Sequence, residues 1–171
     1  MSIVKPLKTI PVGVVVERQR AKSPWIDHVW RPIVALPGVP DTAAWSKLSD
    51  DGECATFYIG AAEIELYPSD TTQYRDNLQS AAPSLWVALR PTGGEPPYTL
   101  LTVTADSAEG EGLTQPGTDI VEPVAMPDPV YDVVAAFVAE HHVERVFFKR
   151  KRDRADTEAL GRRSAMPEKK K

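Results

Sequence analysis

The sequence predicts an α+β fold, a mainly antiparallel β-sheet or small barrel of about six strands with a C-terminal amphipathic helix packed on it. Two observations support this prediction. The strand candidates follow one another in hairpin order, without the βαβ alternation of a doubly wound parallel sheet. The clearest helical pattern follows all of them. A length of 171 residues suits one domain with its own core.

The first two strand candidates lie near the N-terminus. From Ile10 to Arg18 the apolar residues alternate and are mostly β-branched, which is typical of a strand. Trp25 to Leu36 is the second candidate, and Pro32 within it cannot donate a ladder hydrogen bond. We therefore expect the second strand to lie at a sheet edge or to contain a bulge.

Four further strands are expected in two antiparallel pairs, 54–59 with 62–67 and 84–90 with 98–104. Gly60 and Ala61 would form the turn of the first pair. A short helix is expected over 71–80. Residues 106–122 have no periodic pattern and are predicted to form a loop.

The final element is a helix over 129–142. Asp128 is placed to cap it and Pro129 suits its first position. Its apolar stripe consists of Val130, Val133, Val134, Phe137, Val138 and His141. This stripe predicts that the helix packs on the sheet.

The net charge of −4 conceals two oppositely charged parts of the chain. Residues 149–171 contain ten basic and four acidic side chains, a net charge of +6. The first 148 residues contain ten basic and twenty acidic side chains, a net charge of −10. We predict a flexible lead over 1–9, one β-rich domain over 10–152, and a disordered basic tail over 153–171, which has too few apolar residues to fold.

Composition also restricts the compartment and the chemistry. The single cysteine excludes an intramolecular disulfide framework and a cysteine-cluster metal site. The longest apolar run is far shorter than the roughly 20 residues of a membrane span. The N-terminus lacks the apolar segment of a secretory signal. We therefore expect a cytoplasmic protein that does not bind membranes.

No catalytic constellation is recognisable in the sequence. Cys54 lies in a strand candidate without a basic neighbour, so a structural thiol is expected. His141 and His142 are adjacent, and successive helical positions point about 100° apart, which prevents both from binding one metal. No glycine-rich phosphate-binding motif occurs. We predict that the protein is not an enzyme and needs no metal or cofactor.

The segment 23–32 is unusually rich in residues that recognise partners. If it is a strand, Trp25, Asp27 and Arg31 lie on one face, whereas His28 and Trp30 lie on the other. Exposed Trp and Arg are common anchors at protein interfaces. The segment is thus either a recognition strand or ordinary core packing with an exposed ion.

A second candidate contact is the basic run Lys149, Arg150, Lys151 and Arg152. Such a run can contact phosphates of nucleic acid. It can also bind an acidic protein partner or the acidic 91–144 region of this chain, or it can merely aid solubility.

Three segments carry a family resemblance: PVGVVVER (Pro11–Arg18), SPWIDHVWRP (Ser23–Pro32) and FVAEHHVERVFFKRKR (Phe137–Arg152). In these segments the chain resembles an uncharacterised, domain-of-unknown-function family of small bacterial proteins encoded beside molybdenum-dependent formate dehydrogenase genes. The resemblance implies an association with molybdoenzyme assembly, and it supplies no catalytic residues.

The leading hypothesis is a non-catalytic accessory or assembly protein of a formate dehydrogenase-type molybdoenzyme. It would act by binding the dehydrogenase or its maturation factors, through the 23–32 segment and the basic run. The alternatives are a nucleic-acid-binding module that uses the tail, and a barrel that binds a pterin or nucleotide in molybdenum cofactor handling.

Overall fold

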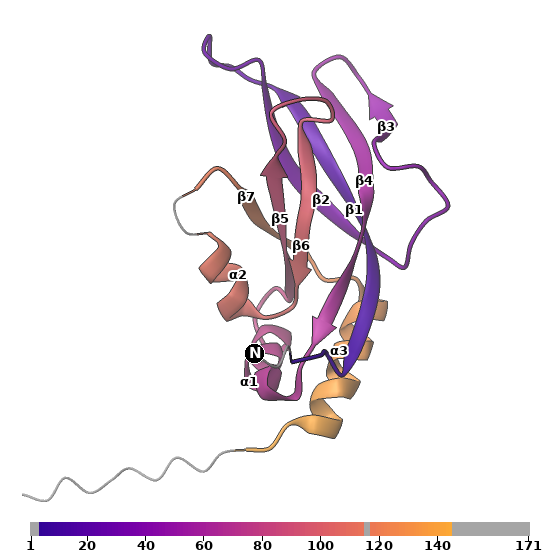
Figure 1. Ribbon diagram of the computed structural model, residues 1–171, viewed down its shortest axis with the longest axis vertical. Coiled ribbons are helices and arrows are strands. Elements are labelled where there is room, and N and C mark those ends of the chain that lie inside the picture. Colours follow the sequence, from indigo (N-terminus) through magenta and orange to yellow (C-terminus); the bar gives the residue numbers. More distant parts are fainter. Residues whose placement is uncertain (1–3, 115–116, 145–171) are drawn as a thin grey trace, which may run out of the picture.

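The computed structural model describes residues 4–114 and 117–144, which form an α+β fold (Figure 1). The elements are β1 (Lys8–Arg20), β2 (His28–Pro37), β3 (Ser46–Asp50), β4 (Cys54–Leu66), the 3-10 turn η1 (Pro68–Asp70), α1 (Thr71–Leu78), β5 (Ser84–Pro91), β6 (Tyr98–Thr104), α2 (Ser107–Leu113), β7 (Ile120–Ala125) and α3 (Asp128–His141). The predicted fold class is confirmed.

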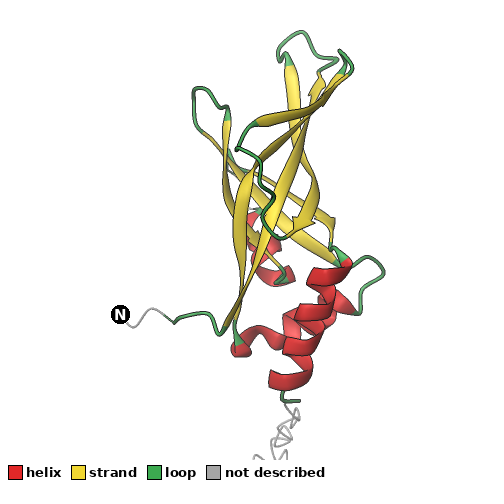
Figure 2. Ribbon diagram, turned by 90° about the vertical axis from the view of Figure 1, so that its right-hand side faces the viewer, coloured by secondary structure: helices red, strands yellow, loops and turns green. Residues whose placement is uncertain are grey.

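The strands form two separate antiparallel sheets, not a closed barrel. One sheet has the order β2-β1-β4-β3 and the other has the order β6-β5-β7. The sheets approach each other along two edges, where β4 lies near β6 and β2 lies near β7. The three α-helices gather at one end of the sheets, and the β1–β2 connection lies at the other (Figures 1 and 2).

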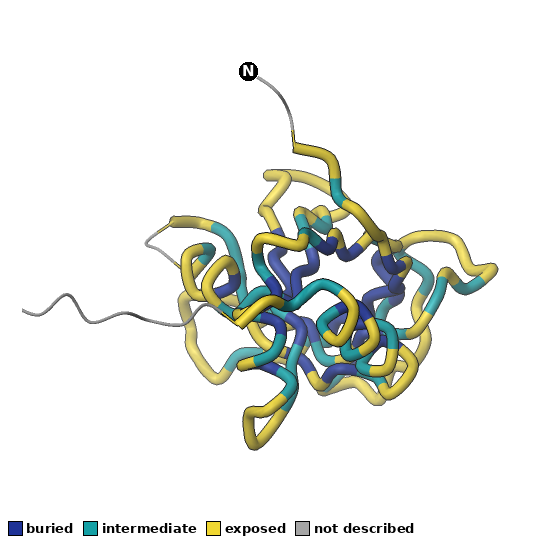
Figure 3. The backbone as a smooth tube through the Cα atoms, turned by 90° about the horizontal axis from the view of Figure 1, so that it is seen from below, coloured by how far each residue is buried: buried dark blue, intermediate teal, exposed yellow. Residues whose placement is uncertain are grey.

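The core lies between the inner faces of the two sheets and continues onto the helices. Val12, Val14 and Val16 of β1 are buried in the same cluster as β5 residues Leu85, Val87 and Leu89. The alternation along β1 is therefore that of a strand with one face on the core, as its sequence predicts. Viewed from the helical end, the buried segments surround the interior and the exposed loops lie outside (Figure 3).

Helix α3 closes the core at the helical end. Val130, Val134 and Phe137 are buried, and the Phe137 ring contacts Tyr74 of α1 with centroids 6.2 Å apart. The predicted helix is confirmed, but its capping is not as expected. Pro127 is the N-cap, and Asp128 is the first helical residue, with no side-chain capping bond.

The C-terminus of α3 is fastened to α1 through His142. Its Nε2 lies 2.9 Å from Arg75 Nη1 and its Nδ1 lies 3.1 Å from Thr71 Oγ1. Because a guanidinium can only donate, Nε2 accepts and Nδ1 carries the proton that is donated to Thr71. The chain leaves the described part of the structure just after this contact.

The predicted hairpin over 54–67 is wrong, because these residues form the single strand β4. Both halves pair with β1, from Cys54 opposite Gln19 to Leu66 opposite Lys8. Gly60 has a φ of 128° at the point where the register shifts between Val14 and Val15. Glycine tolerates this conformation, so it produces a bulge in a long strand and not a turn.

The predicted loop over 106–122 is also wrong, because it contains α2 and the start of β7. The Asp106 carboxylate caps α2 by accepting hydrogen bonds from the Ala108 and Glu109 amides, at 2.8 and 3.1 Å. Gly110 is the only buried residue of this helix, so its sequence has no apolar stripe. Strand β3, which has only five residues, was also not predicted.

The first two strands differ from prediction mainly at their ends. β1 begins at Lys8, so two residues of the predicted lead belong to the sheet. The expectation for Pro32 is confirmed, because β2 is an edge strand and its pairing with β1 shifts between Val15 and Val16, next to Pro32.

Two glycines of α2 provide a matched test of packing between this helix and β5. A Cβ at position 110 would lie 2.2 Å from Cγ of Trp86, whereas a Cβ at 112 would meet nothing within 4 Å. We expect Gly110→Ala to lower the free energy of unfolding by about 1–3 kcal/mol through overpacking. Gly112→Ala should raise it by up to about 1 kcal/mol, since Ala favours helices.

Urea denaturation of both variants measures this difference. Equal effects of the two substitutions would contradict the packing of α2 on Trp86.

Candidate functional site

The longer sheet extends beyond the shorter one at the end opposite the helices. β1 and β4 each have 13 residues, whereas β5 has 8 and β6 has 7. Tyr98, the first residue of β6, lies against Trp30, which pairs with Arg18, so Gln19 and Arg20 of β1 lie beyond this contact. The β5–β6 loop, including Pro96 and Pro97, borders the inner face of this extension. We call this region, with the β1–β2 connection and residues 45–57, the open end.

The β1–β2 connection carries the most exposed large side chains of the open end. Trp25 is 90% exposed, Ile26 is 53% exposed and Val29 is 45% exposed. The Ala21 amide donates to the Asp27 carbonyl at 3.0 Å, which closes the connection. We call residues 21–27 the hairpin tip.

The predicted start of the second strand at Trp25 is therefore wrong, since β2 begins at His28. Pro24 lacks an amide donor and favours a turn, which ends the ladder before Trp25. As a result, the two tryptophans of the segment do not share one strand. Trp25 is exposed at the hairpin tip, whereas Trp30 packs against the edge of the core.

Basic side chains surround the hairpin tip. Residues 18–31 contain four Arg or Lys residues and one acidic residue, Asp27. These are four of only ten basic residues in the first 148. Arg31 is already paired, because its Nη2 lies 2.8 Å from Oε1 of Glu17 on the neighbouring strand. The segment 18–31 is thus a basic region on a predominantly acidic domain.

Trp30 lies at the centre of an aromatic cluster on the inner face of the open end. Its ring centroid is 5.7 Å from that of Trp45, 5.6 Å from that of Phe57 and 6.1 Å from that of Tyr98. A half-open cavity of about 640 Å³ adjoins this cluster. It is lined by Arg18, His28, Trp30, Trp45, Phe57, Glu95, Pro96 and Pro97.

Trp45 is a site residue that sequence analysis missed. Its φ is 68°, in the left-handed region that residues other than glycine rarely adopt. Such a conformation costs of the order of 1–3 kcal/mol. The backbone of Trp45 is held there by a hydrogen bond from its amide to the Tyr58 carbonyl. No periodic pattern surrounds Trp45, so its position depends on the pairing of β3 with β4.

Two cations flank the rings. The Arg18 guanidinium is 5.8 Å from the Trp30 centroid and 5.4 Å from that of Phe57, and Lys47 Nζ is 5.9 Å from Phe57. Lys47 Nζ contacts Asp50 Oδ2 at 2.7 Å, but Arg18 Nη2 is 4.0 Å from the same oxygen. Within the described residues the Arg18 guanidinium donates no hydrogen bond to protein.

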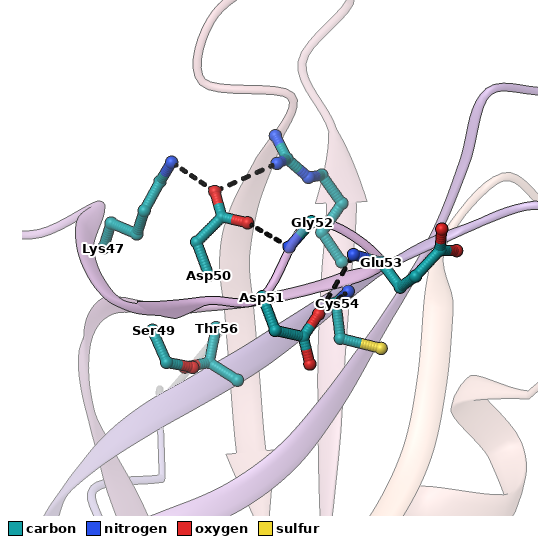
Figure 4. A network of polar contacts seen from close by, with 9 residues as sticks. Lys47, Ser49, Asp50, Asp51, Gly52, Glu53, Cys54 and Thr56 are labelled. Atoms are coloured by element: carbon teal, nitrogen blue, oxygen red, sulfur yellow. Dashed lines mark hydrogen bonds and ion pairs between the residues drawn. The ribbon is translucent and has the colours of Figure 1, made fainter.

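The acidic turn between β3 and β4 carries Asp50 and Asp51, which lie near Lys47 and the Cys54 backbone (Figure 4). The hydrogen bond from Lys47, followed by that from the Gly52 amide, lowers the pKa of Asp50. Asp51 Oδ1 accepts hydrogen bonds from the Cys54 amide at 2.7 Å and the Glu53 amide at 3.0 Å, and these lower the pKa of Asp51. Both carboxylates therefore stay ionised and keep the turn closed.

The pKa of the Cys54 thiol is shifted in the opposite direction. Partial burial raises its pKa above the ordinary value of a cysteine, and the carboxylates of Glu17, Asp51 and Glu53 raise it further. The thiolate is the nucleophilic form of cysteine, so this environment suppresses reactivity.

A second hollow, of about 590 Å³, lies between β4 and β6. Three of its lining residues are acidic: Glu63, Glu65 and Glu109. The hydroxyl of Tyr67 donates to Glu65 Oε2 at 2.5 Å, and this bond, with burial, raises the pKa of Tyr67 to about 12. Thr104 Oγ1 donates to Glu109 Oε2 at 2.6 Å. Two of the three acids are therefore engaged within the protein.

The structure places the predicted contact residues in three settings. Trp25 and Asp27 belong to the hairpin tip, His28 and Trp30 line the aromatic cavity, and Arg31 is paired with Glu17 on the other face. The basic run Lys149, Arg150, Lys151 and Arg152 lies outside the described residues.

Residues 4–114 and 117–144 contain no group of three or more His, Cys, Asp or Glu side chains placed to hold a metal ion. Over the same residues, no helix combines the length and the apolar character needed to cross a bilayer.

The reactivity of Cys54 tests the electrostatics of the open end. We expect the pH profile of iodoacetamide alkylation to have a higher midpoint in the folded protein than in the urea-unfolded protein, because the folded thiol has a raised pKa. Glu53→Gln should speed alkylation at pH 8 by about two- to fivefold, since it removes one negative charge near the thiol. Glu63→Gln, the same charge change far along β4, is the control. A folded-state midpoint at or below the unfolded one would contradict this account.

Comparisons with known proteins place the chain in a family. Neither the curated proteins nor the solved structures include a significant match to this chain. The family model described as "Protein of unknown function (DUF3305)" matches residues 11–152. That range contains both sheets from Pro11 onward, all three helices and the whole open end. The chain therefore belongs to the DUF3305 family of proteins of unknown function.

Proposed function

We propose that this protein is a non-catalytic accessory protein that binds an acidic partner protein through its hairpin tip. The partner is a subunit or maturation factor of a formate dehydrogenase-type molybdoenzyme. The observation that carries the proposal is the 90% exposure of Trp25 at the end of a basic hairpin.

An exposed indole supplies a large part of the binding energy when a partner covers it. Burial of the roughly 150–250 Å² of a Trp side chain is worth about 4–6 kcal/mol before the costs of association. Because Trp25 makes almost no contact in the free protein, nearly all of this gain is realised on binding. Ile26 and Val29 extend the same apolar surface.

Charge distribution supports an acidic partner. The basic residues around the hairpin tip attract an acidic surface, whereas the remaining acidic domain repels it. Such a field steers the two proteins so that the tip meets the partner first. Arg beside Trp is also a frequent combination at the centre of protein interfaces.

The link with a molybdoenzyme rests on the sequence resemblance. Trp25 lies within Ser23–Pro32, one of the three segments that carry it. The non-catalytic role follows from the sequence, which has no recognisable nucleophile, acid–base or phosphate-binding motif.

A pull-down tests the proposal. Full-length tagged protein is used to capture partners from cells that express a molybdenum formate dehydrogenase. We expect recovery of a dehydrogenase subunit or maturation factor, and Trp25→Ala should reduce this recovery about tenfold or more, because an interface anchor is lost. Leu7→Ala, an exposed apolar truncation outside the open end, should leave recovery unchanged.

The same variants distinguish other partners. Recovery of neither a dehydrogenase subunit nor a maturation factor would refute the proposed partner, and full recovery with Trp25→Ala would refute the proposed surface. A gel shift of single-stranded RNA at about 50 mM salt that weakens steeply with salt and is lost in Trp25→Ala would instead assign the basic tip to nucleic acid.

A further inference from the structure

We infer that the aromatic cavity of the open end binds a nucleoside monophosphate, an anion with a planar base. This site is separate from the docking of the hairpin tip, because it uses the inner face of the sheet. Aromatic rings that can stack on a base lie there beside the Arg18 guanidinium, whose N–H groups donate no hydrogen bond to the described part of the protein.

The rings provide the surface for a planar ligand. Trp30, Trp45 and Phe57 all line the cavity, and Pro96 and Pro97 border it from the β5–β6 loop. Aromatic side chains bind nucleobases by stacking, because every base presents a π face. A cavity of about 640 Å³ lies within the size range of small-ligand sites.

Arg18 provides the attraction for an anion. Its side chain is 30% exposed, and its Nη2 forms a long ion pair, at 4.0 Å, with Asp50 Oδ2, which also binds Lys47 Nζ at 2.7 Å. A guanidinium has five N–H donors in a geometry that matches phosphate. In the part of the chain that the structure covers, none of these donors forms a protein hydrogen bond, so they can meet a ligand phosphate.

The remaining polar wall complements a heterocycle. Glu95 and His28 both line the cavity. A carboxylate accepts hydrogen bonds from the amino and imino groups at the edge of a base. The cavity therefore combines acceptors for the ring edge with a donor for the phosphate.

The conformation of Trp45 indicates that the cavity is a built feature. Strained backbone at a residue other than glycine concentrates at ligand sites. Trp45 lies directly before β3 and has a left-handed φ of 68°. Its ring contacts those of Trp30 and Phe57. The hydrogen bond from the Trp45 amide to the Tyr58 carbonyl and the pairing of β3 with β4 keep the ring in position without a ligand.

The test uses the four indole N–H signals of the full-length protein in ¹H–¹⁵N spectra, assigned by single Trp→Phe variants. Adenosine and guanosine monophosphate are titrated separately to about 5 mM, well above the dissociation constant of a moderate site. We expect at least one of them to shift the Trp30 and Trp45 signals in a saturable way. The signal of Trp86, which packs on α2, should not move.

Matched variants and probes test the role of Arg18. Arg18→Gln should weaken binding about tenfold or more, since a charged hydrogen bond to phosphate is lost. Arg90→Gln, which removes an arginine paired with Asp119 on the other sheet, should leave binding unchanged. An unchanged Trp86 signal in the absence of ligand verifies that each variant is folded.

Three results would overturn the inference. The first is the absence of saturable shifts at Trp30 and Trp45. The second is equal binding of adenosine without phosphate, which would remove the role of Arg18, and the third is equal shifts with inorganic phosphate alone, which would remove the role of the rings. Trp25→Ala separates this inference from the proposed function, because it should abolish partner capture but retain nucleotide binding.

Discussion

The burial of the inner valines of β1 in the core between the two sheets is the interaction on which the other features depend. β1 is an interior strand that pairs with both β2 and β4, and Val12, Val14 and Val16 belong to the same core as the inner residues of β5. Removal of that apolar surface from water holds the two sheets face to face. The register of β1 therefore determines which side chains of β2 and β4 face the interior.

The same register explains the open end. Toward the ends of β1 and β4 the alternation continues where only the start of β6 and the β5–β6 loop lie over the inner face. The inward-facing positions are occupied by valines in the core. Farther along the strands, toward the open end, they are occupied by Arg18, Trp30 and Phe57. These residues pack partly on one another and partly face the cavity. An overhanging strand thus converts core positions into the wall of a candidate binding site.

The predicted contact segment is divided between the hairpin tip and the aromatic cavity. A continuous strand through Trp25 would have placed its side chain opposite the face of Trp30 at the same sheet edge. The turn at Pro24 instead separates the two indoles, so that Trp25 is exposed at the hairpin tip while Trp30 lines a cavity. The docking surface and the ligand site that we propose therefore lie at the same end of the domain and use different tryptophans.

The sequence by itself determined the fold class, the core face of β1, the edge position of β2 and the terminal helix, because each depends on local periodicity or on proline chemistry. It also identified Trp25 and Trp30 as candidate contacts. Tertiary structure decided that Gly60 forms a bulge and not a turn, because only pairing with β1 along its whole length keeps β4 straight through that residue. It also decided the place of Trp45 and the unused donors of Arg18. These features depend on strands that are distant in sequence and pack together at the open end, and no local sequence pattern predicts that packing.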